Sequence, residues 1–199
     1  LSEKPRLLPK RKCNLSVNIA LTGTPGTGKT SLSKILNLNT LSINDYYPNI
    51  SNGKDAEDNW LVDIDKMNKE INVSNFSDTV FEGHTSHFLK NLDFVIVLRC
   101  HPDKLKDRLM VRKYREEKII ENMEAEALNI ITQEAIDEYG EANVHEIDTS
   151  SSKLTESKNL LDDIINGNIK SNKWNVIKVP LKNKLDHIDA NRATAKYYK

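Results

Sequence analysis

The sequence of 199 residues has few cysteines and no long apolar run. Its two cysteines, Cys13 and Cys100, are too few for a disulfide framework. No stretch approaches the roughly 20 apolar residues that a membrane-spanning helix needs, and the start lacks the charged-then-apolar profile of a secretory signal. These absences predict a soluble, cytoplasmic protein with no membrane partner and no redox role for its thiols.

Net charge is also absent, because 29 Lys and Arg residues balance 29 Asp and Glu residues. The charges are unevenly distributed along the chain: residues 1–13 carry a net charge of +4, residues 170–199 carry +6, and the middle carries −10. Each patch makes its own local field. We therefore divide the chain into a basic extension (1–14), one folded domain (15–169) and a second basic extension (170–199).

Short apolar runs alternate with segments of helical period, a pattern typical of an α/β domain with a mostly parallel sheet. Five strands are predicted, at 17–21, 41–43, 79–81, 94–98 and 144–147. Helices are predicted at 31–36, 65–71, 103–111 and 117–139, the last with an acidic outer face, and a further helix begins at a Thr155 cap and ends at Gly167. Residues 45–57 are predicted to be irregular, and 174–179 to be either a further strand or a docking segment.

A phosphate-binding loop is the strongest motif in the sequence. Residues 23–30 read GTPGTGKT, which matches G-x-x-x-x-G-K-[ST] between a predicted strand and a predicted helix. In such a loop the backbone N–H groups surround phosphate oxygens, the lysine reaches the β and γ phosphates, and the hydroxyl binds magnesium. Those roles fall on Lys29 and Thr30.

The base is predicted to be adenine. A guanine-reading N-K-x-D sequence occurs at 183–186, but it lies in the basic tail after the predicted sheet is complete. A D-x-x-G switch is also missing after the third strand. We therefore expect ATP rather than GTP.

Residues 80–89, VFEGHTSHFL, place acid and imidazole groups directly after the third strand. Glu82 stands where P-loop proteins carry the acid that holds magnesium. His84 lies two residues on, on the same side of the extended chain, and is predicted to orient or deprotonate a water or a phosphate acceptor. His87 is predicted to support the site or to lie on the surface.

Together the motifs TGTPGTGKT, FEGH, LRC, RLMVRKY and KIIENMEAE resemble the adenylate kinase isoenzyme 6 (CINAP-type) family over residues 17–165. The resemblance implies an adenylate-kinase-like fold, with a monophosphate-binding region at about 43–62 and a short lid at about 111–121. It also implies adenylate kinase and ATPase activities, and a role in small ribosomal subunit maturation through the ribosomal protein uS11. The basic extensions suit small-subunit rRNA.

Residue by residue, the resemblance implies that Arg108 and Arg112 match two lid arginines, one stacking on adenine and the other bridging phosphates. Lys29, His84 and Arg112 are the predicted catalytic residues, and Thr30 and Glu82 the predicted magnesium ligands. The predicted nucleotide-binding residues are Gly23, Thr24, Pro25, Gly26, Thr27, Gly28, Lys29, Thr30, Ser31, Arg108 and Arg112.

Two positions depart from the family pattern. The family carries an arginine after the aspartate that matches Asp45, whereas this chain reads NDYYPNI and has no arginine between Arg11 and Arg99. Lysine does not replace a bidentate arginine equally, although Lys54 is a candidate substitute. Lys113 stands where the family has a lid glycine. Both departures favour ATP hydrolysis over transfer to AMP.

The sequence therefore predicts a magnesium-dependent ATPase that assists small-subunit maturation, with weaker or absent adenylate kinase activity. Two alternatives stay open. One is a nucleoside-monophosphate kinase of nucleotide metabolism. The other is a nucleotide-gated chaperone for a ribosomal protein, with little turnover.

Overall fold

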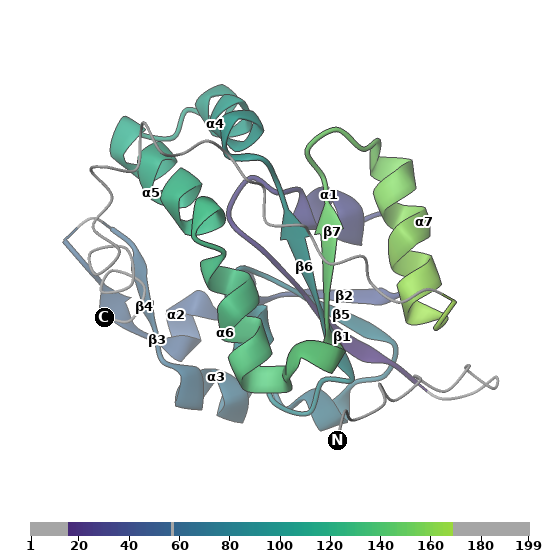
Figure 1. The fold of residues 1–199 in the computed structure, drawn as a ribbon. Helices are drawn as coiled ribbons and strands as arrows, with labels where there is room; N and C mark the ends of the chain where they lie inside the picture. Colours follow the sequence, from purple (N-terminus) through teal and green to yellow (C-terminus); the bar gives the residue numbers. More distant parts are fainter. Residues whose placement is uncertain (1–15, 57, 169–199) are drawn as a thin grey trace, which may run out of the picture.

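The computed structural model describes residues 16–56 and 58–168 (Figure 1). The predicted extensions, 1–14 and 170–199, lie outside the described residues, as do the sequences at 174–179 and 183–186. Over the described ranges, no helix combines the length and the apolar character that crossing a membrane requires.

A parallel sheet of five strands forms the centre of the fold, in the order β2-β5-β1-β6-β7. The strands are β1 Asn18–Thr22, β2 Asn39–Ser42, β5 Thr79–Glu82, β6 Phe94–Arg99 and β7 Val144–Asp148. All six residues of β6 are buried, as expected for a central parallel strand that is covered on both faces. The five predicted strands and the α/β class are confirmed.

Helices cover both faces of the sheet (Figure 1). On one face α1 Lys29–Ser33 and α7 Leu154–Ile165 pack on alternate strand residues such as Ile96 and Leu98. On the other face α2 Tyr47–Ile50, α3 Ile64–Glu70 and α6 Ile130–Tyr139 pack on the intervening residues, such as Val95 and Val97. The strand period of two thus divides the core into two layers.

Two helices, α4 Pro102–Val111 and α5 Glu116–Ala127, lie beyond the carboxyl end of β6 (Figure 1). They pack on one another through Leu105, Leu109 and Ile119. Because ligands of open α/β sheets bind outside the carboxyl ends of the strands, this pair borders the place where a ligand is expected.

The segment predicted to be irregular, 45–57, contains regular structure, so that prediction was wrong in part. A 3-10 turn (η1 Ile43–Tyr46) leads into α2, and β3 Ser51–Lys54 pairs antiparallel with β4 Trp60–Val62. Asp58, in the turn between the two strands, has a positive φ. Gly53, which also has a positive φ, lies within β3 where the pairing register shifts. Three further 3-10 turns are η2 Val73–Asn75, η3 Ser86–Phe88 and η4 Glu141–Asn143.

The single helix predicted at 117–139 is two helices, α5 and α6. Asn129 interrupts it with a φ of 61°, a left-handed conformation that asparagine tolerates better than most residues. The backbone N–H of Asn129 donates to the carbonyl of Glu126 at 3.2 Å, which closes α5. Its side chain accepts a hydrogen bond from Arg99.

The predicted cap of the last helix was also wrong. Lys153, not Thr155, is the N-cap of α7, and its backbone N–H donates to the Glu156 carboxylate at 3.1 Å. Gly167 follows the helix with a φ of 68°, as predicted for the residue that ends it.

Candidate active site

The phosphate loop connects β1 to α1 and packs tightly on the sheet. At Gly23, which has a φ of +135°, a side-chain Cβ would lie 2.4 Å from the carbonyl oxygen of Leu98 in β6. Only glycine fits that approach, so the first glycine of the motif fixes how the loop leaves the sheet. The loop therefore lies at the carboxyl edge of the sheet, as predicted.

Lys29 points back into the loop. Its Nζ donates to the carbonyl oxygens of Gly23 at 2.6 Å and Thr24 at 3.2 Å. Burial lowers its pKa to about 8, against the opposing effect of the carboxylates of Glu82 and Glu126. An anion bound in the loop would favour the charged form of this lysine, so the side chain is suited to meet phosphate.

Glu82 ends β5 directly beside α1. Its Oε1 accepts a hydrogen bond from Thr30 Oγ1 at 3.0 Å, and the residue is buried. A hydroxyl and a carboxylate side by side are oxygen donors that suit magnesium, so these two residues fit the predicted metal role. Among the described residues no cluster of three or more His, Cys, Asp or Glu side chains is arranged to hold a metal, but magnesium in such sites keeps waters and phosphate oxygens as its other ligands.

His84 follows Glu82 after a glycine that the packing requires. A Cβ on Gly83 would lie 2.9 Å from Cβ of Ile43, so this position cannot carry a side chain without a shift. The ring of His84 meets Tyr47 edge-on, with 3.0 Å between Nδ1 and the tyrosine oxygen. Helix α2 therefore contributes Tyr47 to the site, a residue that the sequence analysis did not select.

Burial first, and then the nearby positive charge of Lys29, lowers the pKa of His84 to about 3. The imidazole is therefore neutral near neutral pH. Burial also raises the pKa of Tyr47 to about 12, so its hydroxyl keeps its proton. The pair is a neutral hydrogen-bonded unit.

His87 is buried, with 1% of its surface exposed, so the surface alternative was wrong. Its Nδ1 lies 3.0 Å from Thr22 Oγ1, and its Nε2 lies 3.1 Å from Glu134 Oε2. Thr22 in turn donates to the carbonyl of His84 at 3.1 Å. His87 thus supports the loop that carries His84.

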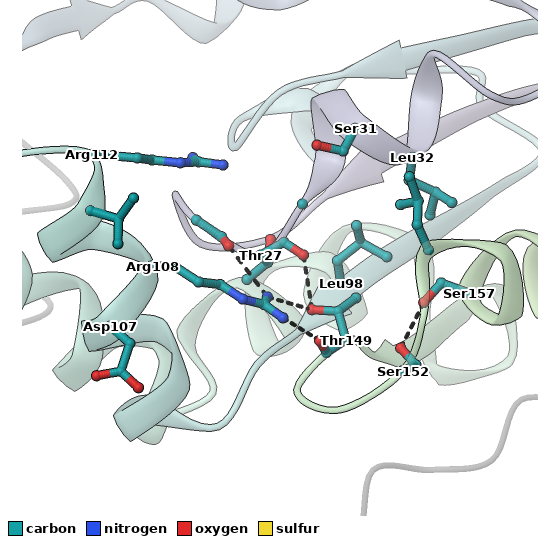
Figure 2. Close-up of a pocket in the computed structure, with 14 residues that line it drawn as sticks. Thr27, Ser31, Leu32, Leu98, Asp107, Arg108, Arg112, Thr149, Ser152 and Ser157 are labelled. Carbon is teal, nitrogen blue, oxygen red and sulfur yellow. Dashed lines mark hydrogen bonds between the residues drawn. The ribbon is translucent and has the colours of Figure 1, made fainter.

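A cavity of about 550 Å³ opens next to the phosphate loop, between α4 and the segment that joins β7 to α7 (Figure 2). Its size is typical of a small-molecule site. Lining residues include Gly26, Thr27, Gly28 and Ser31 of the predicted binding set, together with Arg108 and Arg112 of the α4 side.

The two arginines of α4 have different environments. Arg108 donates to Thr149 Oγ1 at 3.1 Å and to the Thr149 carbonyl, and lies 3.5 Å from the carbonyl of Gly26 (Figure 2). Arg112 caps α4, lines the cavity and makes no hydrogen bond or ion pair with another described side chain. Arg108 therefore ties α4 to the loop after β7, and Arg112 is the arginine available to a ligand.

Two carboxylates of the acidic segment 117–139, Glu126 and Glu134, are buried, and the sequence analysis assigned a role to neither. Glu126 accepts from Thr24 Oγ1 at 2.5 Å, from Arg99 Nε at 2.6 Å and from the backbone N–H of Cys100 at 3.1 Å. Glu134 pairs with His87. The sequence signal was present, since Glu126 lies in the quoted ENMEAE motif, but its contact with Thr24 spans 102 positions and helical period does not reveal it.

Lys113 occupies the position of the family's lid glycine, with a φ of 59°. The N–H of Lys113 donates to the carbonyl of Met110 at 2.9 Å, and the N–H of Tyr114 donates to that of Leu109 at 3.2 Å. This is the Schellman arrangement that ends helices, and glycine is its usual residue.

Comparisons with known proteins identify relatives of this chain. A family model described as "AAA domain" matches residues 19–129. A protein of Methanothermobacter thermautotrophicus is 40% identical over 155 residues, covering 75% of this chain and 90% of the relative. One of Methanococcus maripaludis is 41% identical over 146 residues, covering 66% and 79%. Both are named "Putative adenylate kinase".

The chain belongs to this family of P-loop proteins. Among solved structures, shikimate kinase from Acinetobacter baumannii in complex with shikimate aligns with a TM-score of 0.53 and 16% identity, covering 77% of this chain and 94% of that one. At that identity the likeness concerns the fold alone. The predicted adenylate-kinase-like P-loop fold is confirmed, and the family resemblance is confirmed at this broader level.

Proposed function

We propose that this protein is a magnesium-dependent ATPase with an adenylate-kinase fold, in which transfer to AMP is a weaker second activity. One observation carries the proposal: Lys29, the Thr30–Glu82 pair and His84 meet at one edge of the sheet, beside a cavity large enough for a nucleoside. P-loop enzymes need these groups to neutralise and position a triphosphate.

Each group has a distinct task. The loop N–H groups and Lys29 hold the β and γ phosphates, and Arg112 neutralises charge from the cavity side. Adenine lies in the cavity against α4. Thr30 and Glu82 would hold magnesium, which when bound supplies positive charge to the phosphate oxygens.

His84 orients the attacking water. A pKa of about 3 makes this imidazole a weak base, since general bases work best when their pKa is near the working pH. A neutral, hydrogen-bonded imidazole instead holds a water in line with the γ phosphorus. The water oxygen then bonds to that phosphorus as the bond to the β–γ bridging oxygen breaks, giving ADP and inorganic phosphate; one water proton stays on the released phosphate and the other passes to solvent.

The acceptor side of the site argues for hydrolysis. Lys54, the candidate replacement for the missing arginine, pairs with Asp58 at 2.8 Å and lies 4.7 Å from the centre of the Trp60 ring. It is thus engaged within the β3–β4 hairpin. The names of the relatives favour the alternative, a nucleoside-monophosphate kinase, and an assay must separate the two.

The role in small-subunit maturation is the finer part of the proposal. It is supported by the resemblance to the isoenzyme 6 family and by the acidic middle of the chain, which suits a basic protein such as uS11, with rRNA at the basic ends. A nucleotide-gated chaperone uses the same surfaces with little turnover. ATP-sensitive binding of uS11 without phosphate release would favour the chaperone.

The deciding experiment measures ADP and inorganic phosphate from Mg-ATP, with and without AMP. Phosphate release that AMP does not change supports the ATPase. ADP formed from ATP and AMP without phosphate supports the kinase. For His84→Ala we expect turnover to fall by about 10² with ATP affinity nearly unchanged, while His101→Asn, which alters a histidine outside the cavity lining and keeps a side-chain acceptor at the N-cap of α4, retains turnover. Unchanged turnover in His84→Ala contradicts the role given to that residue.

A further inference from the structure

A continuous chain of buried hydrogen bonds runs from α6 to the main chain of the proposed catalytic loop. Glu134 Oε2 lies 3.1 Å from His87 Nε2, His87 Nδ1 lies 3.0 Å from Thr22 Oγ1, and Thr22 Oγ1 donates to the His84 carbonyl at 3.1 Å. The three side chains are 7%, 1% and 0% exposed. They come from three different elements, α6, η3 and β1.

The order carboxylate, imidazole, hydroxyl is that of a nucleophilic triad, but these three side chains cannot act as one. The Thr22 hydroxyl has no exposed surface, so no substrate reaches it. Its single hydrogen is directed at the His84 carbonyl, which leaves the oxygen to accept from the His87 ring. The three side chains therefore hold the His84 backbone in place and take part in no group transfer.

The His84 carbonyl is a costly atom to bury without a partner. It belongs to the turn between β5 and η3, where the chain has left the sheet ladder after Gly83. Thr22 supplies the missing donor from the strand that leads directly into the phosphate loop. This hydrogen bond thus fixes the position of the His84 backbone relative to Gly23, the first residue of the phosphate loop.

Tyr47 fixes the other end of the same residue, since its hydroxyl lies 3.0 Å from His84 Nδ1. The ring is then held by Tyr47 of α2 and the backbone carbonyl by Thr22 of β1. These two contacts, one to the ring and one to the backbone carbonyl, fix the position of His84 beside the phosphate loop.

We propose that Glu134, His87 and Thr22 are positioning residues, which hold the backbone of His84 where its ring can orient the attacking water. The proposal rests on the proposed function, because it needs His84 to act in turnover. It adds residues to the reaction that touch neither nucleotide nor metal.

Thr22→Val tests the last link, because valine keeps the branched shape of threonine and removes the hydroxyl. We expect kcat to fall about tenfold, as when an orienting hydrogen bond is lost, with ATP affinity within about twofold of the wild type. Thr22→Ser, which restores the hydroxyl, should regain most of the lost activity. Thr79→Val is the matched control, since Thr79 is also buried, begins β5 at the end away from His84, and donates to the Ser77 carbonyl.

The decisive measurement repeats Thr22→Val in a His84→Ala background. If Thr22 acts through His84, the second change has no further effect on kcat, because coupled residues are non-additive. A full tenfold loss in that background overturns the positioning role. If the wild type releases no phosphate from Mg-ATP, the proposed function fails. If the wild type turns over and His84→Ala keeps full turnover, the ATPase stands and the positioning proposal fails, so the two failures are distinguishable.

Glu134→Gln tests the far end of the chain and serves if Thr22→Val does not fold. Glutamine keeps the length and one acceptor but loses the charge. We expect a smaller fall in kcat, again absent in the His84→Ala background. Wild-type kcat in both Glu134→Gln and a folded Thr22→Val overturns the proposal.

Discussion

Replacing Glu126 is expected to damage both stability and nucleotide binding, because this buried carboxylate joins three parts of the fold. It accepts hydrogen bonds from Thr24 of the phosphate loop, from Arg99 of β6 and from the backbone of Cys100. Only 4% of its surface is exposed. Few alternative partners are therefore within reach if it is lost.

The size of the effect follows from those contacts. Glu126→Leu leaves the buried guanidinium of Arg99 with less compensation, although Glu146 and Asn129 still accept from it. Removing one partner of a buried ion pair costs about 3–5 kcal/mol, and the remaining acceptors place the expected loss near the lower end. Glu126→Gln keeps hydrogen-bonding atoms without the charge and should cost less.

Urea unfolding and ATP titration of the same variants provide the test. Glu121→Gln, on the same helix, is the matched control: its pair with Lys118 is partly exposed, and exposed pairs contribute about 0–1 kcal/mol. We expect ATP affinity to fall in Glu126→Leu and not in Glu121→Gln, since only Glu126 holds Thr24. A Glu126→Leu variant as stable and as tightly binding as Glu121→Gln would refute the reasoning.

Two further changes test other parts of the molecule. His145 is buried, and neither ring nitrogen has a partner among the described residues. Burial lowers its pKa below 6.5, so the native state binds fewer protons than the unfolded chain. The contribution of His145 to stability is therefore complete above pH 6.5 and falls as the pH drops below it. His145→Leu should be more stable and lose part of this acid sensitivity, and denaturation midpoints from pH 7 to 4 that match the wild type would contradict this. Lys113→Gly should raise the free energy of unfolding by up to about 1 kcal/mol, because glycine adopts the left-handed conformation without a steric penalty. A lower unfolding midpoint in urea would show that the lysine side chain stabilises the protein by more than its left-handed backbone destabilises it.

The phosphate loop and the five strands were predictable because their signals are local. A glycine at position 23 is required by one close approach to β6, and a strand covered on both faces has a continuous apolar sequence. The FEGH prediction also rested on order along the chain, since Glu82 ends a strand next to β1. In each case the motif or apolar run is visible in a short stretch of sequence, although the contact that requires it, such as that of Gly23 with Leu98, joins distant segments.

The missed features depend on contacts between distant segments. A 3.6-residue period continues through Asn129, so the sequence predicts one helix, whereas the turn there is stabilised by Arg99, 30 positions away. The break changes which residues face the core, and Glu126 and Glu134 become buried on two separate helices. Tyr47 was missed for the same reason, because its partner His84 lies 37 positions on.

The packing of α5 affects the predicted lid, and with it the choice between hydrolysis and transfer. Of the lid predicted at 111–121, residues 112–115 are the part outside helices, because α5 begins at Glu116 and is anchored by Ile119, Asn122 and Glu126. Kinase lids close over the triphosphate and exclude water, which protects it from hydrolysis. Because the α5 part of the predicted lid is packed on the domain, residues 112–115 are the part that can still close over a ligand. We therefore expect Arg112 to reach the phosphates while water still enters, as an ATPase requires.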